Sequence, residues 1–210
     1  MTPTRTTRTR IGTALALAGA IAALAPMAAQ AESSFVNGAS GALSANARLD
    51  FRVTIPKILF LQVGTGTGRA ANGTIDLIDF TVAAADLGLG TTVAGTGGDL
   101  GGGAVTARLL SNGGNVTLQS TTTGALSNGT DTLSFGQIVA APSVLTSATA
   151  LAHPTLVDGG STSSTITATN GVVNRDARWT FSFSNSAVVP AGTYGGTATN
   201  GRVTYTASVL

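Results

Sequence analysis

Carboxylates are the side chains of this sequence best suited to chemistry, because two of them held close together can act as general acid and general base. The aspartates are scattered along the chain: Asp50, Asp76, Asp79, Asp86, Asp99, Asp131, Asp158 and Asp176. Asp76 and Asp79 are the closest in sequence, but three residues apart on a strand they point to opposite faces. The spacing therefore indicates solvated charges at a strand edge and no catalytic pair.

The single histidine, His153, stands directly before Pro154 and has no cysteine, glutamate or second histidine near it. Metal sites and histidine-centred triads need such partners, so the sequence predicts a loop residue at this position. Nucleophile-elbow, P-loop and zinc-ligand patterns are also missing. We therefore expect no enzyme, no catalytic residue and no metal site.

Two glycine-rich stretches resemble ligand-binding loops. Gly66-x-Gly68-x-x-Ala71 matches a dinucleotide fingerprint, but strand-like residues 74–82 follow it in place of the required helix. Residues 97–101 are similar to a calcium-binding nonapeptide, but the stacked repeats that such sites need are absent. Both stretches are interpreted as loops, the second as part of a flexible, glycine-rich connection over residues 90–103, and no cofactor is expected.

The first 31 residues have the pattern of a secretory signal peptide. Arg5, Arg8 and Arg10 precede an apolar run, and Ala29-Gln30-Ala31 is a small-residue cleavage site. Cleavage would leave residues 32–46 as a flexible extension and 47–210 as one domain, without a membrane span. We expect the protein to be exported to the periplasm, the cell surface or the extracellular space.

Residues 32–210 carry eight lysines and arginines against nine acidic residues, a net charge of 8 − 9 = −1, so the basic character of the whole chain comes mostly from the leader. No basic patch interleaved with aromatic residues indicates nucleic-acid binding. Cysteine is absent, so burial and hydrogen bonding must stabilise the exported domain without disulfides.

Apolar residues alternate with small or polar ones over an unusual length between Leu43 and Ile55. The alternation predicts a half-buried strand, longer than an ordinary one, which Pro56 breaks or confines to a sheet edge. The candidate donor strand, the half that could pair with a neighbouring molecule, consists of Leu43, Ala45, Ala47 and Leu49.

The last 34 residues have the clearest strand pattern. Ala177, Trp179, Phe181 and Phe183 share one face of a strand, and Asn200-Gly201 suits a type I′ turn into a closing strand that contains Tyr205. The expected structural core is Phe51, Phe60, Trp179, Phe181, Phe183 and Tyr205. The hydroxyl of Tyr194 is expected to bond to the backbone, as in a tyrosine corner.

Asn-Gly pairs punctuate these apolar alternations and indicate hairpins, at Asn37, Asn72, Asn112, Asn128, Asn170 and Asn200. The predicted fold is therefore an all-β, antiparallel sandwich. Its expected core lies between two sheets.

The segment 190–194, the closing strand 203–207 and the proline-broken first strand resemble those of secreted bacterial pilin-like β-sandwiches. These include spore-coat-U-type proteins and chaperone-usher fimbrial subunits, and WxL-type surface domains end similarly. Two features differ: the disulfide common in fimbrial subunits is absent, and Val209 replaces the usual aromatic residue second from the C-terminus.

The resemblance implies an immunoglobulin-like sandwich at the cell surface that assembles into fibres by donating an N-terminal strand. Its implied partners are copies of itself, other surface subunits and a periplasmic chaperone. The leading hypothesis is a non-enzymatic structural surface protein, a fimbrial or extracellular-matrix subunit. The alternative is a self-contained module that binds glycan, cell wall or host protein, since about ten strand-like segments suffice to complete a sandwich unaided.

Overall fold

The computed structural model describes residues 32–196 and 198–209, so the predicted signal peptide lies outside the described residues. The chain divides into two compact units, Met1–Thr54 and Ile55–Leu210. The first unit contributes residues 32–54, which we call the arm. The second unit contains every strand found among the described residues.

The described residues form an almost purely β structure, which confirms the all-β, antiparallel prediction. Two short 3-10 helices, Ala84–Asp86 and Phe135–Gln137, are its only helical segments among those residues. The strands are β1 (Leu59–Val63), β2 (Ile78–Asp79), β3 (Val93–Ala94), β4 (Thr96–Gly97), β5 (Ala104–Ser111), β6 (Val116–Thr122), β7 (Leu126–Ser127), β8 (Thr132–Leu133), β9 (Ile138–Ser143), β10 (Gly160–Ile166), β11 (Val173–Phe183) and β12 (Thr204–Val209).

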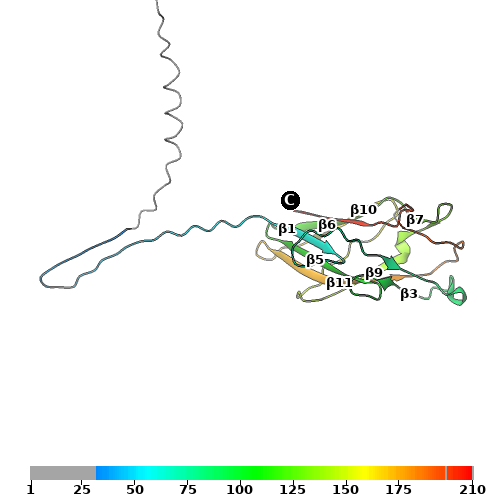
Figure 1. Cartoon of the computed structure of the whole chain (residues 1–210), viewed down its shortest axis with the longest axis horizontal. Helices are drawn as coiled ribbons and strands as arrows, with labels where there is room; N and C mark the ends of the chain where they lie inside the picture. The colour runs from blue at the N-terminus through cyan, green and yellow to red at the C-terminus, as the bar shows by residue number, and fades with distance from the viewer. Residues whose placement is uncertain (1–31, 197, 210) are drawn as a thin grey trace, which may run out of the picture. The chain divides into compact units, whose positions relative to one another are not determined.

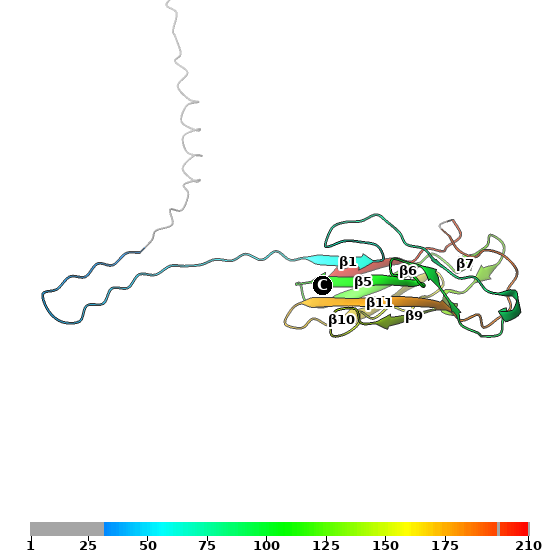
Figure 2. The ribbon, with the colours of Figure 1, turned by 60° about the horizontal axis from the view of Figure 1, so that its bottom comes forward.

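Two antiparallel sheets make up the body of the second unit. The larger has five strands in the order β1-β5-β11-β3, with β9 also paired to β11, and the smaller has the order β10-β6-β12. Figure 1 shows β6 and β10 in one layer and β5, β9 and β11 in the other. In Figure 2, β1, β5 and β11 run side by side.

Alternate side chains of the two sheets meet in one hydrophobic core, an arrangement consistent with a β-sandwich. From the larger sheet come Val105, Ala107, Leu109, Val173, Ala177, Trp179 and Phe181, and from the smaller Val116, Leu118 and Ile166. Trp179 is completely buried, and its indole nitrogen donates to the carbonyl of Leu151 over 2.7 Å. Phe183 is also buried, and Tyr205 packs partly buried against the core.

The predicted hairpins are mostly wrong. β11 and β12 do not pair with each other, because β12 pairs with β6 in the opposite sheet. In the same way β5 and β6, and β10 and β11, follow one another in sequence but belong to different sheets. The β5–β6 and β10–β11 connections therefore pass from one sheet to the other. β7 and β8 do pair with each other, so the hairpin predicted at Asn128-Gly129 is confirmed.

The Asn-Gly pairs differ in the conformation that they adopt. At Asn170-Gly171 both φ angles are positive, 52° and 77°, as a type I′ turn requires, and Thr169 and Val172 exchange both backbone hydrogen bonds. At Asn200-Gly201 only Asn200 has a positive φ, 62°, so the predicted type I′ turn does not form. The hydroxyl of Tyr194 donates to the carbonyl of Pro190 over 2.7 Å, in agreement with the expected tyrosine corner.

The predicted long strand is not formed: residues 42–58 have no strand assignment, and β1 begins only at Leu59. Phe51, expected in the core, is 86% exposed, since no other strand pairs with its segment. Phe60 is half-buried on the outer side of β1, whereas its neighbours Leu61 and Val63 pack against the core. Residues 47–54, expected in the folded domain, belong to the arm.

Candidate functional site

The arm exposes apolar side chains that no other part of the described chain covers. Leu43 is 53% exposed, Leu49 72% and Val53 82%, and Ala45 and Ala47 on the same face are also exposed. Clusters of exposed apolar side chains are common at interaction sites. The residues of the candidate donor strand are therefore exposed, on a segment without strand pairing among the described residues.

Within the arm, the guanidinium of Arg48 donates two hydrogen bonds to the carboxylate of Glu32, at 2.7 and 2.9 Å. This contact lowers the pKa of Glu32 and raises that of Arg48, because each charge favours the ionised form of the other. Both side chains are solvent-exposed, so water and salt screen the pair. This ion pair involves only the side chains of Glu32 and Arg48. The apolar side chains of the arm therefore stay exposed.

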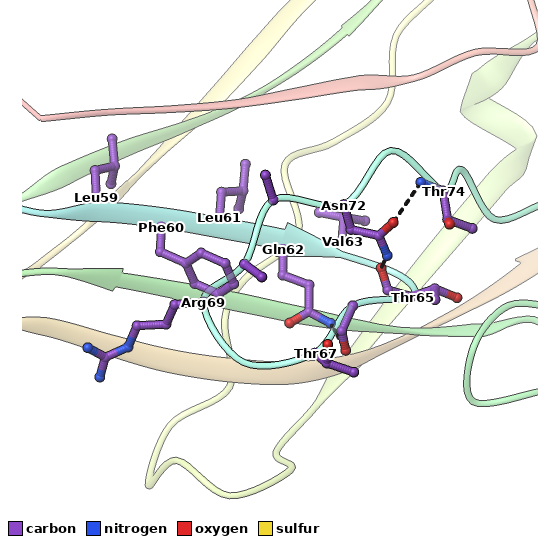
Figure 3. A pocket seen from close by; sticks show the side chains of 13 residues that line it. Leu59, Phe60, Leu61, Gln62, Val63, Thr65, Thr67, Arg69, Asn72 and Thr74 are labelled. Atoms are coloured by element: carbon purple, nitrogen blue, oxygen red, sulfur yellow. Dashed lines mark hydrogen bonds between the residues drawn. The ribbon is translucent and has the colours of Figure 1, made fainter.

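A second candidate site is a shallow groove on the outer side of β1. Figure 3 shows Phe60 and Gln62 extending from β1 toward the loop that carries Thr65, Thr67 and Arg69, on the side opposite to the core-facing residues. Strand alternation explains this arrangement, since every second side chain of β1 must point away from the core. The hollow between β1 and the loop has a volume of about 390 Å³.

Side-chain hydrogen bonds hold the loop over β1 in place of regular secondary structure. The Asp76 carboxylate accepts from the backbone nitrogen and the hydroxyl of Thr65, at 2.5 and 2.8 Å. Asn72 donates to the carbonyl of Thr65 over 2.8 Å and accepts from the nitrogen of Thr74 over 3.0 Å. These hydrogen bonds therefore fix the loop that forms one wall of the groove.

Gln62 lies at the floor of this groove and is only 9% exposed. Its amide nitrogen donates to the carbonyl of Gly64 over 2.8 Å, but its side-chain oxygen Oε1 is buried without a hydrogen-bond partner among the described residues. Buried polar atoms are rarely unpartnered, so this oxygen is an acceptor that a donor entering the groove could use.

The groove continues across the outer face of the larger sheet into a second hollow of about 330 Å³. Phe60 and Arg69 line both hollows, and Arg108 and Arg175 line the second. None of these three arginines makes an ion pair or a side-chain hydrogen bond within the described residues. Arg69 and Arg108 therefore leave two guanidinium groups beside Phe60 with their donors free. Arg175 stands opposite the core residue Leu109, so it belongs to the core-facing side of β11.

Asp176 is the carboxylate that lines the second hollow, and its oxygens are already engaged. They accept from the backbone nitrogens of Thr146 and Ser147, each at 2.9 Å, and from the Thr146 hydroxyl. Burial raises the pKa of Asp176, but these hydrogen bonds outweigh burial and hold the pKa well below its usual range. Asp176 therefore stays ionised and anchors the 146–147 segment.

His153 lies in a cluster of aromatic rings, which the sequence did not predict. Its ring is 4.7 Å from that of Trp179 and 5.3 Å from that of Phe181, in edge-on arrangements, and Nε2 shares a 2.7 Å hydrogen bond with the Tyr205 hydroxyl. Burial lowers the pKa of His153 to about 4 and raises that of Tyr205. The histidine is accordingly a neutral core residue on an irregular segment.

The aspartates act mainly as structural acceptors. Asp99 accepts from the nitrogen of Thr106 and Asp158 from that of Phe135, at 2.8 and 2.7 Å.

Within residues 32–196 and 198–209, no three metal-binding side chains cluster. No helix of that part of the chain is long and apolar enough to cross a membrane. The exposed phenylalanines in the same part, Phe35 and Phe51, both lie on the arm.

The chain matches no protein-family model, no curated protein and no solved structure. Its function must therefore be inferred from the arm and the groove.

Proposed function

We propose that this chain is an exported, non-enzymatic structural surface protein, a fimbrial or extracellular-matrix subunit with an immunoglobulin-like sandwich. Its partners are further copies of itself or other surface subunits, with a periplasmic chaperone protecting it before assembly. The arm supports this proposal most directly, because its alternating apolar residues are exposed and it pairs with no strand among the described residues.

A strand added to a sheet edge gains backbone hydrogen bonds along its length and buries every second side chain. The arm has the period of two that this requires, and burying its large apolar residues on a neighbour removes them from water. The second unit offers free edges, since β1, β9, β10 and β12 each pair with one strand within the described residues. Addition of the arm of one copy to the edge of another is the proposed assembly step.

The test compares two substitutions on opposite faces of the arm. Leu49→Asp places a charge on the apolar face, whereas Asn46→Asp introduces the same residue on the other face. In full-length exported protein, SDS-resistant ladders should persist in Asn46→Asp and disappear in Leu49→Asp and on deletion of residues 32–46.

Two results would contradict the proposal. One is a wild-type protein that forms no ladder or higher oligomer at any concentration. The other is a ladder that Leu49→Asp leaves unchanged. Far-UV circular dichroism of each variant checks that the sandwich is still folded, since the substituted residues lie outside the second unit.

A further inference from the structure

The groove over the outer face of the larger sheet carries an inference independent of the arm. We propose that it is a binding site for an acidic saccharide, a chain of sugar residues bearing carboxylates. The residues that would contact the ligand are Phe60, Gln62, Arg69 and Arg108.

Charge supports the acidic part of this proposal. Residues 32–210 carry eight lysines and arginines in all, with a net charge of −1, yet Arg69 and Arg108 both line this one groove. The nearest carboxylate, Asp176, is engaged with Thr146 and Ser147, and Asp99 is bound to the Thr106 backbone nitrogen. The guanidinium groups of Arg69 and Arg108 are therefore free to bind an external anion, and their planar donors suit a carboxylate in a bidentate arrangement.

The register between strands explains why the Arg108 guanidinium and the Phe60 ring are neighbours. Gln62 of β1 stands opposite Arg108 of β5, and Arg108 stands opposite Asp176 of β11. One row along, Phe60 stands opposite Leu110. Side chains directly opposite each other on a sheet lie about 5 Å apart, so ring, amide and guanidinium form one continuous surface.

The neutral groups favour a saccharide over other anions. The half-buried Phe60 ring offers an apolar plane on which the C–H face of a sugar can pack, and the unpartnered Gln62 oxygen can accept from a hydroxyl. Hydroxyl and amide groups of Thr65, Thr67, Asn72 and Asn174 line the same hollows. Nucleic acid would require several stacking aromatics along a basic track, and only one aromatic residue lines this groove.

The size of the site is also suitable. The two hollows, of about 390 and 330 Å³, share Phe60 and Arg69 and fall within the range of small-ligand sites. A ligand extending from one hollow to the other would place successive sugar units past the ring and then past Arg108. An oligosaccharide therefore fits better than a single sugar.

The experiment measures binding of hexagalacturonate to the full-length mature protein by isothermal titration calorimetry at 0.15 M salt. The carboxyl-reduced hexasaccharide, hexaglutamate and a single-stranded hexanucleotide serve as comparison ligands. We expect hexagalacturonate to bind and each comparison ligand to bind at least tenfold more weakly. Equal binding of the reduced sugar, of hexaglutamate or of the oligonucleotide would overturn the proposal, as would no detectable binding of hexagalacturonate at millimolar concentration.

Variants then locate the site. Arg108→Gln should weaken hexagalacturonate binding about tenfold, because a charge-assisted contact is lost. Phe60→Leu should weaken it several-fold. The control, Arg52→Gln, removes the same charge from the arm at a position that lines neither hollow, and should change affinity by about twofold or less, since salt screens distant charges.

Unchanged affinity in Arg108→Gln, or an equal loss in Arg52→Gln, would overturn the assignment. Because Arg108 is exposed, its substitution is not expected to impair folding. Deleting residues 32–46 should leave binding intact, so failure of the assembly proposal and failure of this one can be distinguished.

Discussion

At the scale of single residues, His153 is the side chain whose environment differs most from its sequence context. Its Nε2 is bonded to Tyr205, and its ring lies edge-on to Trp179 and Phe181. A histidine with a pKa of about 4 in the folded state resists protonation that it would accept near pH 6.5 when unfolded. Between these values the unfolded state binds more protons, so folding stability must fall as the pH is lowered.

We predict that the free energy of unfolding decreases by roughly 2–3 kcal/mol between pH 7 and pH 4.5 because of His153. His153→Phe keeps an aromatic ring but has no titrating nitrogen, so its stability should change little between pH 6.5 and 5, although losing the Tyr205 partner lowers it at neutral pH. Urea denaturation of both proteins across this range gives the comparison. Since the sequence contains one histidine, equal slopes in the two proteins would contradict the prediction.

The core and site residues show how far the burial and the neighbours of single residues could be predicted from the sequence. The period-two pattern places Trp179, Phe181 and Phe183 on one face, and burial of that face follows from the chemistry of their side chains. The same pattern suggested burial of Phe51, but periodicity identifies a face without showing whether anything covers it. No local signal marked Gln62 or Arg108, because their proximity arises from the register between β1 and β5.

At the scale of elements, the glycine-rich segment 90–103 was predicted to be a flexible connection. In the structure it contains β3 and β4, and β3 joins the edge of β11. Gly103 donates to the carbonyl of Gly97 and accepts from the nitrogen of Phe181, at 3.1 and 2.9 Å. Gly103 therefore lets the backbones of residues 95–97 and 103 approach closely, in addition to allowing the chain to turn.

We predict that Gly103→Ala destabilises the fold by about 3 kcal/mol or more, whereas Gly102→Ala costs about 1 kcal/mol. Both positions have positive φ, 70° and 60°, and so share the conformational strain of a side chain. A Cβ on Gly103 would lie 2.6 Å from the Cα of Gly95, but a Cβ on Gly102 would meet nothing within 4 Å. Thermal unfolding followed by circular dichroism measures the difference, and equal losses in the two variants would show that the close approach is unimportant.

At the scale of the whole molecule, the arm and the second unit differ in how far they expose their apolar side chains to solvent. The second unit encloses its core between two sheets, whereas the arm leaves its large apolar side chains exposed. If the arm is an assembly element, its accessibility should change when copies associate, while that of the sandwich should not.

We predict that trypsin cleaves the unassembled protein first after Arg48 and Arg52, in the exposed and unpaired arm, and much later within β11 after Arg175 and Arg178. In assembled material the two arm sites should be protected at least tenfold, because added strands are hydrogen-bonded along their length. Mass spectrometry of the products over time gives the rates. Equal cleavage of the arm in both states would argue against strand addition.

The sequence by itself determined the class of secondary structure, the separation of core-facing from outward side chains along β11, and several turns, because steric preferences and the period of two act over a few residues. Only the tertiary structure decided that β12 pairs with β6, that His153 enters the core, that the arm has no partner strand within the described residues, and that Arg69 and Arg108 meet beside Phe60. These outcomes depend on hydrogen bonds and contacts between segments far apart in the chain, which local patterns do not specify.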